Sequence, residues 1–189
     1  MNVLPTVETD RLVLRVPAAE NAPEMAGYAA RNREHFAPWD PVRDDAYFTV
    51  DHWRTELERT VERARAGTAL MLVLLAKDAR DGPVLGQCTF SGIARGAFHA
   101  AYLGYALSHD AVGKGLMSEA LRAAIRYCFD ELNLHRIMAN YMPTNVRSAA
   151  LLRRLGFVPE GYARDYLFLA GAWQDHVLTS LTNPDWAPR

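Results

Sequence analysis

Residues 110–120 read DAVGKGLMSEA, a stretch that sets Gly113 and Gly115 on either side of a lysine, immediately before an amphipathic helix. Helices usually begin with Ser, Asp or Asn, whose side chains accept hydrogen bonds from the first N–H groups. Glycines offer no such acceptor, and these N–H groups stand at the positive end of the helix dipole. The stretch is therefore either a plain turn whose N–H groups bind water, or a site where an anion approaches bare backbone.

Two familiar phosphate-binding motifs do not match this stretch. A Walker A loop requires Gly-x-x-x-x-Gly-Lys-Ser/Thr, but here Gly115 follows Lys114 and the upstream glycine is missing. The dinucleotide fingerprint Gly-x-Gly-x-x-Gly has Ser118 in place of its third glycine and comes late in the chain. The spacing argues against a nucleotide triphosphatase and a dinucleotide-binding domain, and it leaves a pyrophosphate on bare backbone as the functional interpretation.

Hydrophobic periodicity predicts a chain that mixes helices with hairpins. Apolar alternation and short apolar runs indicate strands at 7–16, 69–76, 84–93, 101–107, 135–142, 157–173 and 174–181, the last two around a turn at Ala170–Gly171. Helical spacing indicates helices at 18–33, 46–66, 116–132 and 145–155, and the proline- and acid-rich stretch 35–45 indicates a loop. Hairpins need antiparallel pairs and helical crossovers can make parallel ones, so we expect one α/β (α+β) domain over residues 1–189 with a mixed sheet.

Composition narrows the range of partners. The formal net charge of −1 gives no broad positive field for nucleic acid or a membrane surface. The longest apolar run, at 69–76, is far shorter than the ~20 residues of a membrane span, and the first residues do not resemble a signal peptide. Cys88 and Cys128 are the only cysteines, without metal-ligand spacing, and we expect reduced, buried thiols. A soluble cytoplasmic protein without a metal is the expectation.

Two blocks around the glycines carry a resemblance to a known family. The blocks are YLGYALSHDAVGKGLMSEAL at 102–121 and HRIMANYMPTNVRSAALLRRLGF at 135–157. They resemble the signature blocks of the GNAT superfamily of acetyl-CoA-dependent N-acetyltransferases: Gln/Arg-x-x-Gly-x-Gly/Ala, then Asn-x-x-Ser with an apolar helix ending in Leu-Gly-Phe. Further segments at 9–15, 36–44, 95–105 and 175–186 are similar to one branch, the bacterial ribosomal-protein-alanine N-acetyltransferases of the RimJ type.

The resemblance implies a strongly twisted mixed sheet of about six or seven strands with about four helices, in which two central parallel strands splay apart. The pantetheine arm of acetyl-CoA would lie in that gap, along backbone groups of Tyr105, Ala106 and Leu107. Its pyrophosphate would be wrapped by Val112, Gly113, Lys114, Gly115, Leu116, Met117 and Ser118, and Asn145 would contact its amides. Val112 and Met117 depart from the Gln/Arg and Gly/Ala of the motif, and a methionine would crowd the loop if it pointed into it.

The implied reaction moves an acetyl group from a thioester to a neutral amine. An α-amine has a pKa of about 7.7–8.0 and needs only a modest base, while the leaving thiolate is helped by a hydroxyl donor. Ser148 is the preferred donor, although its hydroxyl could instead bond a backbone carbonyl one turn back, and Asn145 could simply cap the helix. Tyr141 is a weaker rival. The general base could be Asp40, Glu160, Asp165 or Asp175, and Asp165 is preferred. We expect His99, His135 and His176 to have structural roles.

The acceptor site is expected between the early loop and the late strands. Phe36, Trp39 and Phe98 could wall it, unless they pack into the core, and Asp40 could hold a charged N-terminus. The branch implies acetyl transfer by direct attack to the N-terminal alanine of a small-subunit ribosomal protein, free or in a pre-ribosomal particle, by a monomer or a dimer. Two alternatives stay open: an acetyltransferase for an antibiotic or polyamine, and a ribosome-assembly factor whose acetylation is incidental.

Overall fold

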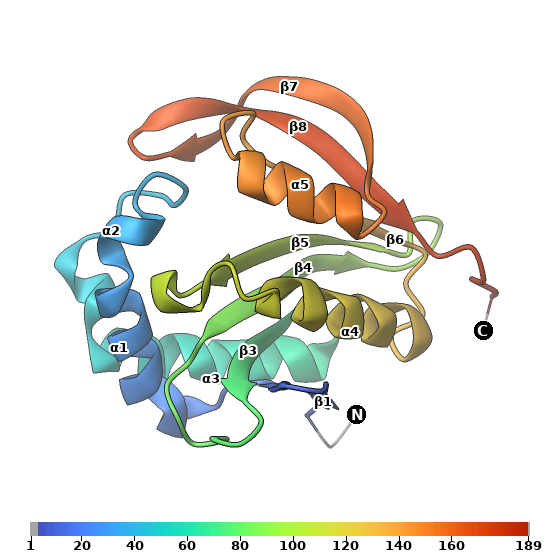
Figure 1. Cartoon of the computed structure of the whole chain (residues 1–189). Helices are drawn as coiled ribbons and strands as arrows, with labels where there is room; N and C mark the ends of the chain where they lie inside the picture. The colour runs from blue at the N-terminus through green and yellow to red at the C-terminus, as the bar shows by residue number, and fades with distance from the viewer. Residues whose placement is uncertain (1–3, 189) are drawn as a thin grey trace.

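A computed structural model describes residues 4–188 as a mixed sheet flanked by helices on both faces (Figure 1). The eight strands lie in the order β1-β2-β3-β4-β5-β6-β8-β7. Their bounds are β1 Thr6–Glu8, β2 Leu12–Arg15, β3 Leu70–Ala76, β4 Gly86–Ala94, β5 Ala100–Leu107, β6 Arg136–Met138, β7 Val158–Leu169 and β8 Ala172–Thr182. All neighbours are antiparallel except β5 and β6.

The parallel pair separates almost at once. β5 and β6 are in register only from Ala100–Arg136 to Tyr102–Met138. The chain after β6 then follows β8 instead, since Ala139 N–H donates to the Thr179 carbonyl at 3.0 Å and Tyr141 bridges Val177. Within the described residues, the edge of β5 beyond Tyr102 therefore has no strand beside it. The expected mixed sheet with splayed central parallel strands is confirmed.

Within residues 4–188, five α-helices cover the sheet. They are α1 Ala22–Arg31, α2 Arg33–Phe36, α3 Val50–Ala66, α4 Leu116–Asp130 and α5 Val146–Arg154, with 3-10 turns at Ala19–Asn21, Asp45–Phe48 and His109–Ala111. Buried residues of α4 and α5 share one core with one face of the strands, while α1 and α3 form a second core on the opposite face. Both α4 and α5 begin at the end of the sheet where β5 finishes (Figure 1).

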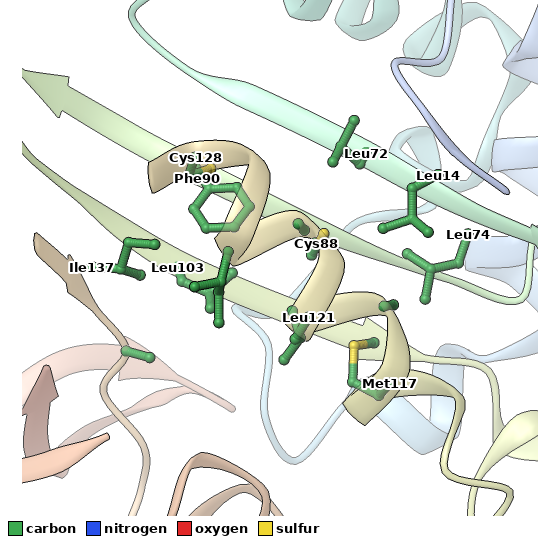
Figure 2. Close-up of a cluster of buried hydrophobic side chains, with 14 of the residues drawn as sticks. Leu14, Leu72, Leu74, Cys88, Phe90, Leu103, Met117, Leu121, Cys128 and Ile137 are labelled. Carbon is green, nitrogen blue, oxygen red and sulfur yellow. The ribbon is translucent and has the colours of Figure 1, made fainter. Parts of the chain in front are cut away.

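The helix after the glycines is built as its periodicity predicts. Leu121, Ala124 and Cys128 of α4 are fully buried, and Leu121 packs among side chains of β2, β3, β4, β5 and β6 (Figure 2). The opposite side of the helix is polar, which gives the amphipathic pattern that a surface helix needs. Both cysteines are buried in this core, and burial raises the pKa of the Cys88 thiol to about 12. The expectation of buried free thiols is confirmed.

The first predicted strand is two strands. Residues 7–16 were expected to run straight, but Thr9–Arg11 turns the chain between β1 and β2. The Thr9 hydroxyl accepts from the Leu12 N–H at 2.9 Å, and the Thr9 N–H donates to the Leu12 carbonyl at 2.9 Å. This local Ser/Thr-type turn explains why the sheet has eight strands rather than six or seven. The four-residue α2 likewise brings the α-helices to five rather than four.

The remaining elements differ from expectation mainly at their ends. The strand expected at 135–142 stops at Met138, because the chain leaves β5 there. The turn at Ala170–Gly171 is confirmed, with both residues in the left-handed region. Across residues 4–188, none of the helices combines the length and apolarity needed to cross a lipid bilayer.

We predict that Leu121→Ala lowers the free energy of unfolding by about 2–5 kcal/mol, because the substitution leaves a cavity in the packed core under α4. Urea unfolding followed by circular dichroism measures the change. The matched control is Arg126→Ala on the exposed side of the same helix, where we expect a change below about 0.5 kcal/mol. Equal losses in the two variants would contradict the assignment of this face to the core.

Candidate active site

The glycine loop before α4 exposes a row of unused backbone donors. Gly113 and Gly115 have φ angles of 82° and 75°, a left-handed conformation that favours glycine, and Gly115 caps α4 without any side-chain hydrogen bond. Within residues 4–188, no acceptor is bonded to the backbone N–H groups of Gly113, Lys114, Gly115, Leu116, Met117 and Ser118. The Val112 N–H, by contrast, donates to the His109 carbonyl at 3.2 Å. The geometry is that of an anion site, with Val112 outside its donor set.

The loop is held from behind by the turn between β1 and β2. The Arg11 guanidinium contacts Glu119 of α4, with Nε to Oε2 at 2.7 Å and Nη2 to Oε2 at 2.6 Å. Arg11 Nη1 also donates to the Lys114 carbonyl at 2.9 Å. In a trans peptide the C=O and the following N–H point in opposite directions, so this bond turns the Gly115 N–H away from Arg11. Arg11 thus orients one of the free donors of the loop.

Glu119 is the anchor of this arrangement. Its Oε1 accepts from the Thr9 hydroxyl at 2.6 Å and from the Arg11 N–H at 2.9 Å. Burial alone would raise the pKa of Glu119, but the hydrogen bonds from Thr9 and Arg11 more than offset that effect and hold the pKa below its usual value. Glu119 is therefore ionised at neutral pH, as an ion pair with Arg11 requires.

The side chains of the loop leave the donor row clear. Met117 is 6% exposed and belongs to the buried cluster under α4 that also holds Leu74 and Leu121 (Figure 2). The departure from Gly or Ala at this motif position therefore does not crowd the loop. Lys114 folds back on the loop, where its Nζ donates to the Asp110 carbonyl at 2.7 Å.

The open edge of β5 supplies a second set of backbone groups. The Ser108 N–H bonds Leu85 on the β4 side, and the His99 carbonyl accepts from His135 on the β6 side. Since N–H and C=O groups alternate sides along a strand, those of Tyr105 and Leu107 face the gap that β6 leaves. The groups of Ala106 face β4, and its carbonyl also accepts from the Tyr28 hydroxyl at 3.2 Å.

A pair of hydroxyls spans the gap. Ser148 Oγ of α5 lies 2.6 Å from the Tyr105 hydroxyl of β5. Asn145 caps α5, with its Oδ1 accepting from the Ser148 N–H at 3.0 Å, which leaves its amide NH2 free of that bond. Burial raises the pKa of Tyr105 to about 12, against a smaller opposing effect of the bond to Ser148. The sequence put Tyr105 among the backbone contacts, and nothing in its local pattern pointed to this partner 43 positions away.

A cavity of about 440 Å³ lies on the other face of β4 and β5 from α4. It is enclosed by α1, α2, the loop before α3 and the two strands. Its lining residues are Tyr28, Ala29, Arg33, Phe36, Ala37, Asp40, Pro41, Val42, Arg43, Tyr47, Phe48, Gln87, Thr89, Gly104, Tyr105 and Ala106. The tip of the β7–β8 hairpin contacts one of these lining residues, because the Ala170 N–H donates to the Asp40 carbonyl at 2.9 Å.

Asp40 is the acidic side chain of this lining. Burial raises its pKa, and nearby Arg43 partly offsets the shift. Arg43 lies over the Tyr47 ring, 4.4 Å from its centre, and Arg33 lies over Phe48 while pairing with Asp45 at 3.1 Å. The described wall thus carries two arginines and one carboxylate, which makes it a poor match for a polycation.

The structure brings some of the expected acceptor residues together and separates others. Phe36 and Asp40 line the cavity, whereas Trp39 is 37% exposed beside them and is not part of the lining. Phe98 lies in the turn before β5, at the opposite end of that strand from the cavity. Asp165 is exposed in a bulge of β7 with a φ of 47°, and its N–H donates to Asp175 at 2.9 Å.

Comparisons with known proteins agree with the fold. Residues 11–158 match the acetyltransferase (GNAT) domain family. The chain is 49% identical over 180 residues to the ribosomal protein uS5-alanine N-acetyltransferase of Escherichia coli K12, covering 95% of this chain and 92% of that one. A solved ribosomal-protein-S5-alanine acetyltransferase from Vibrio fischeri superposes with a TM-score of 0.92 at 41% identity, covering 97% and 100% of the two chains. Mycobacterium smegmatis RimJ, solved in complex with CoA-disulfide, superposes with a TM-score of 0.86 at 28% identity, covering 98% of this chain and 89% of that one.

We predict that Arg11→Ala weakens binding of coenzyme A about tenfold, because the Lys114–Gly115 peptide loses the bond that orients its N–H; tenfold corresponds to ~1.4 kcal/mol. Isothermal titration calorimetry measures the affinity. Arg80→Ala is the matched control, since it breaks an exposed Arg–Glu pair with Glu8 in the same part of the sheet without touching the loop.

Glu119→Gln distinguishes orientation of the loop from direct contact with the anion. If Arg11 acts by orienting the loop, a weaker contact between Arg11 and Glu119 should also weaken the binding of coenzyme A. Tighter binding in Glu119→Gln, or equal losses in Arg11→Ala and Arg80→Ala, would contradict the positioning role.

Proposed function

The chain belongs to the GNAT acetyltransferase family, and from this premise we propose that it transfers the acetyl group of acetyl-CoA to the N-terminal α-amine of a ribosomal protein. The relative that is 49% identical over 95% of the chain supports the N-terminal alanine of uS5 as the acceptor. We take residues 1–189 as one catalytic domain. The observation that carries the proposal is that the glycine loop and the cavity lie on opposite faces of the sheet, and that β5, which lines the cavity and leads into the loop, has an open edge beyond Tyr102.

The residues of this chain fit acetyl-CoA without further groups. The free N–H donors from Gly113 to Ser118 suit a pyrophosphate, and an added Cβ at Gly113 would meet nothing within 4 Å, so the loop is open to a ligand. The backbone groups of Tyr105 and Leu107 suit the amides of the pantetheine arm, as does the NH2 of Asn145. When bound, acetyl-CoA supplies a thioester whose acetyl carbon an amine can attack.

We propose direct attack, in which the C–N bond forms, the C–S bond breaks, the amine loses a proton and the sulfur gains one. Neither thiol of the chain can carry the acetyl group, because Cys88 and Cys128 are fully buried in the core. We propose that Ser148, whose hydroxyl lies at the gap beside Tyr105, gives the sulfur its proton. Tyr105 stays protonated at neutral pH, so it can donate to Ser148 and leave the serine proton free for transfer.

We assign the amine end of the reaction to Asp40. Its carboxylate lies in the cavity wall and its pKa is raised, which suits a group that holds an ammonium and accepts a proton through water. Asp165, preferred from the sequence, lies outside the lining. The two arginines beside Asp40 disfavour a polyamine, so a polypeptide N-terminus with one positive charge is the better match for the acceptor.

We predict turnover on peptides with a free N-terminal alanine and none on the same peptides blocked at the N-terminus but carrying lysine, because an α-amine is deprotonated far more readily at neutral pH. Thiol release from acetyl-CoA measures the rate, with aminoglycosides and polyamines assayed in parallel. Turnover only on the small amines would overturn the ribosomal acceptor. No turnover on any amine, together with co-sedimentation with ribosomal particles, would favour an assembly factor.

We predict that Ser148→Ala lowers kcat about 100-fold while leaving the affinity for coenzyme A within about twofold, the range expected for loss of a general acid. Tyr105→Phe should lower kcat less, because Ser148 keeps its own proton. Ser180→Ala is the control, since that hydroxyl bonds Glu160 away from the gap. An unchanged kcat in Ser148→Ala would remove the serine from the mechanism.

A further inference from the structure

The floor of the cavity is a small patch formed by four residues of two paired strands. Gln87 of β4 lies opposite Ala106 of β5, and Thr89 lies opposite Gly104. Cys88, between Gln87 and Thr89, and Phe90, after Thr89, are fully buried in the core on the α4 face. Because side chains alternate along a strand, Gln87 and Thr89 point to the α1 face, where both line the cavity.

The polar half of this floor has no partner in the protein. Within residues 4–188, Gln87 Oε1 is buried and bonded to no donor, and no hydrogen bond joins the Thr89 hydroxyl to another group. A buried amide oxygen without a donor is unfavourable, and such groups in native proteins usually have a partner. Because Gln87 lines the cavity, a turn of its carboxamide can present this oxygen to the donor of a ligand.

The other half of the floor lacks side-chain bulk. An added Cβ at Gly104 would meet nothing within 4 Å, and Gly104 is not among the residues with a positive φ. The backbone therefore does not demand glycine at this position. Glycine at this position leaves space directly beside Thr89. The next side chain on this face of the strand is only the methyl group of Ala106. The bond from the Tyr28 hydroxyl to the Ala106 carbonyl holds this part of the strand in place.

We propose that this floor binds the main chain of the acceptor, with the Gln87 carboxamide paired to its first peptide unit above Gly104 and Ala106. A carboxamide carries both an acceptor and donors, so Gln87 can accept from the N–H of the second residue and donate to the carbonyl of the first. The space over Gly104 admits a small first side chain. Asp40, in the opposite wall, is left for the amine. This inference rests on the proposed function and makes Gln87 the residue that distinguishes a polypeptide N-terminus from an isolated amine.

The test compares an alanine-initiated peptide with its depsipeptide analogue, in which an ester oxygen replaces the N–H of the second residue. In the wild-type protein we expect kcat/KM to fall about tenfold from amide to ester, the loss of one buried hydrogen bond. In Gln87→Leu we expect kcat/KM for the amide to fall similarly and the difference between amide and ester to disappear. If Gln87 served only in packing, Gln87→Leu would lower kcat/KM equally for the amide and the ester. The ratio of the two kcat/KM values would then stay as in the wild-type protein.

A second pair of variants tests the space over Gly104. Gly104→Val should lower kcat/KM for the peptide at least 100-fold with the affinity for coenzyme A unchanged, because the new side chain fills the floor. Ser91→Val is the matched control: it adds a branched side chain two positions beyond Thr89 on the same strand, outside the cavity lining, and should leave turnover unchanged. Full activity of Gly104→Val would overturn the placement of the acceptor.

The outcomes also separate the inference from the proposed function. If the wild-type protein does not acetylate the alanine peptide, the proposed function fails. If it does, but amide and ester react equally or Gln87→Leu keeps the wild-type ratio, the inference fails and the proposed function stands.

Discussion

The early separation of β6 from β5 is the constraint on which the rest of the site depends. Backbone groups inside a sheet must normally be paired, and Arg136–Met138 of β6 pair with both β5 and β8 before the chain continues along β8 alone. Asn140 helps to hold this segment on β8, because its Oδ1 accepts from the Thr179 N–H and its NH2 donates to the Tyr166 hydroxyl, each at 3.2 Å. The edge of β5 is left open as a result. The bond between Tyr105 and Ser148 then spans the gap from its two sides.

The two parts of the candidate site lie on opposite faces of the sheet. The glycine loop belongs to the α4 face, where Arg11 and Glu119 hold it. The cavity belongs to the α1 face, and its wall and floor come from other elements. On the proposed function, the two reactants approach from opposite faces and meet along β5, so neither blocks the entry of the other. This arrangement suits the proposed direct transfer, which needs both molecules bound at once.

The sequence was most informative where a local pattern determines the structure. The periodicity of α4, the buried apolar strand at 69–76 and the glycines of the loop all depend on nearest neighbours, and each was predicted. The same periodicity places Met117 on the buried side with Leu121 and Ala124, so the concern about crowding had its answer in the spacing of the helix. The hairpin at Thr9 was missed because one hydroxyl, rather than a Gly or Pro, makes the turn.

Contacts between distant segments could not be predicted from local sequence patterns. Arg11 and Glu119 are 108 positions apart, and Tyr105 and Ser148 are 43 apart, so no periodicity connects them. The same holds for the choice among acids, because only the folded chain shows that Asp40 lines the cavity and Asp165 does not. Residue types and a family motif identified the family, but the partners of each group depend on the tertiary fold.

The groups that the fold leaves unpaired share one chemical character. The loop offers backbone N–H groups, the edge of β5 offers backbone N–H and C=O groups, and the cavity floor offers the Gln87 carboxamide. All are uncharged amides, which recognise other amides and phosphate oxygens by the direction of hydrogen bonds rather than by net charge. The pantetheine arm and a peptide N-terminus are both amide chains. On the proposed function, the fold therefore binds its two reactants by the same interaction that pairs its own strands, and this is consistent with a chain whose net charge is only −1.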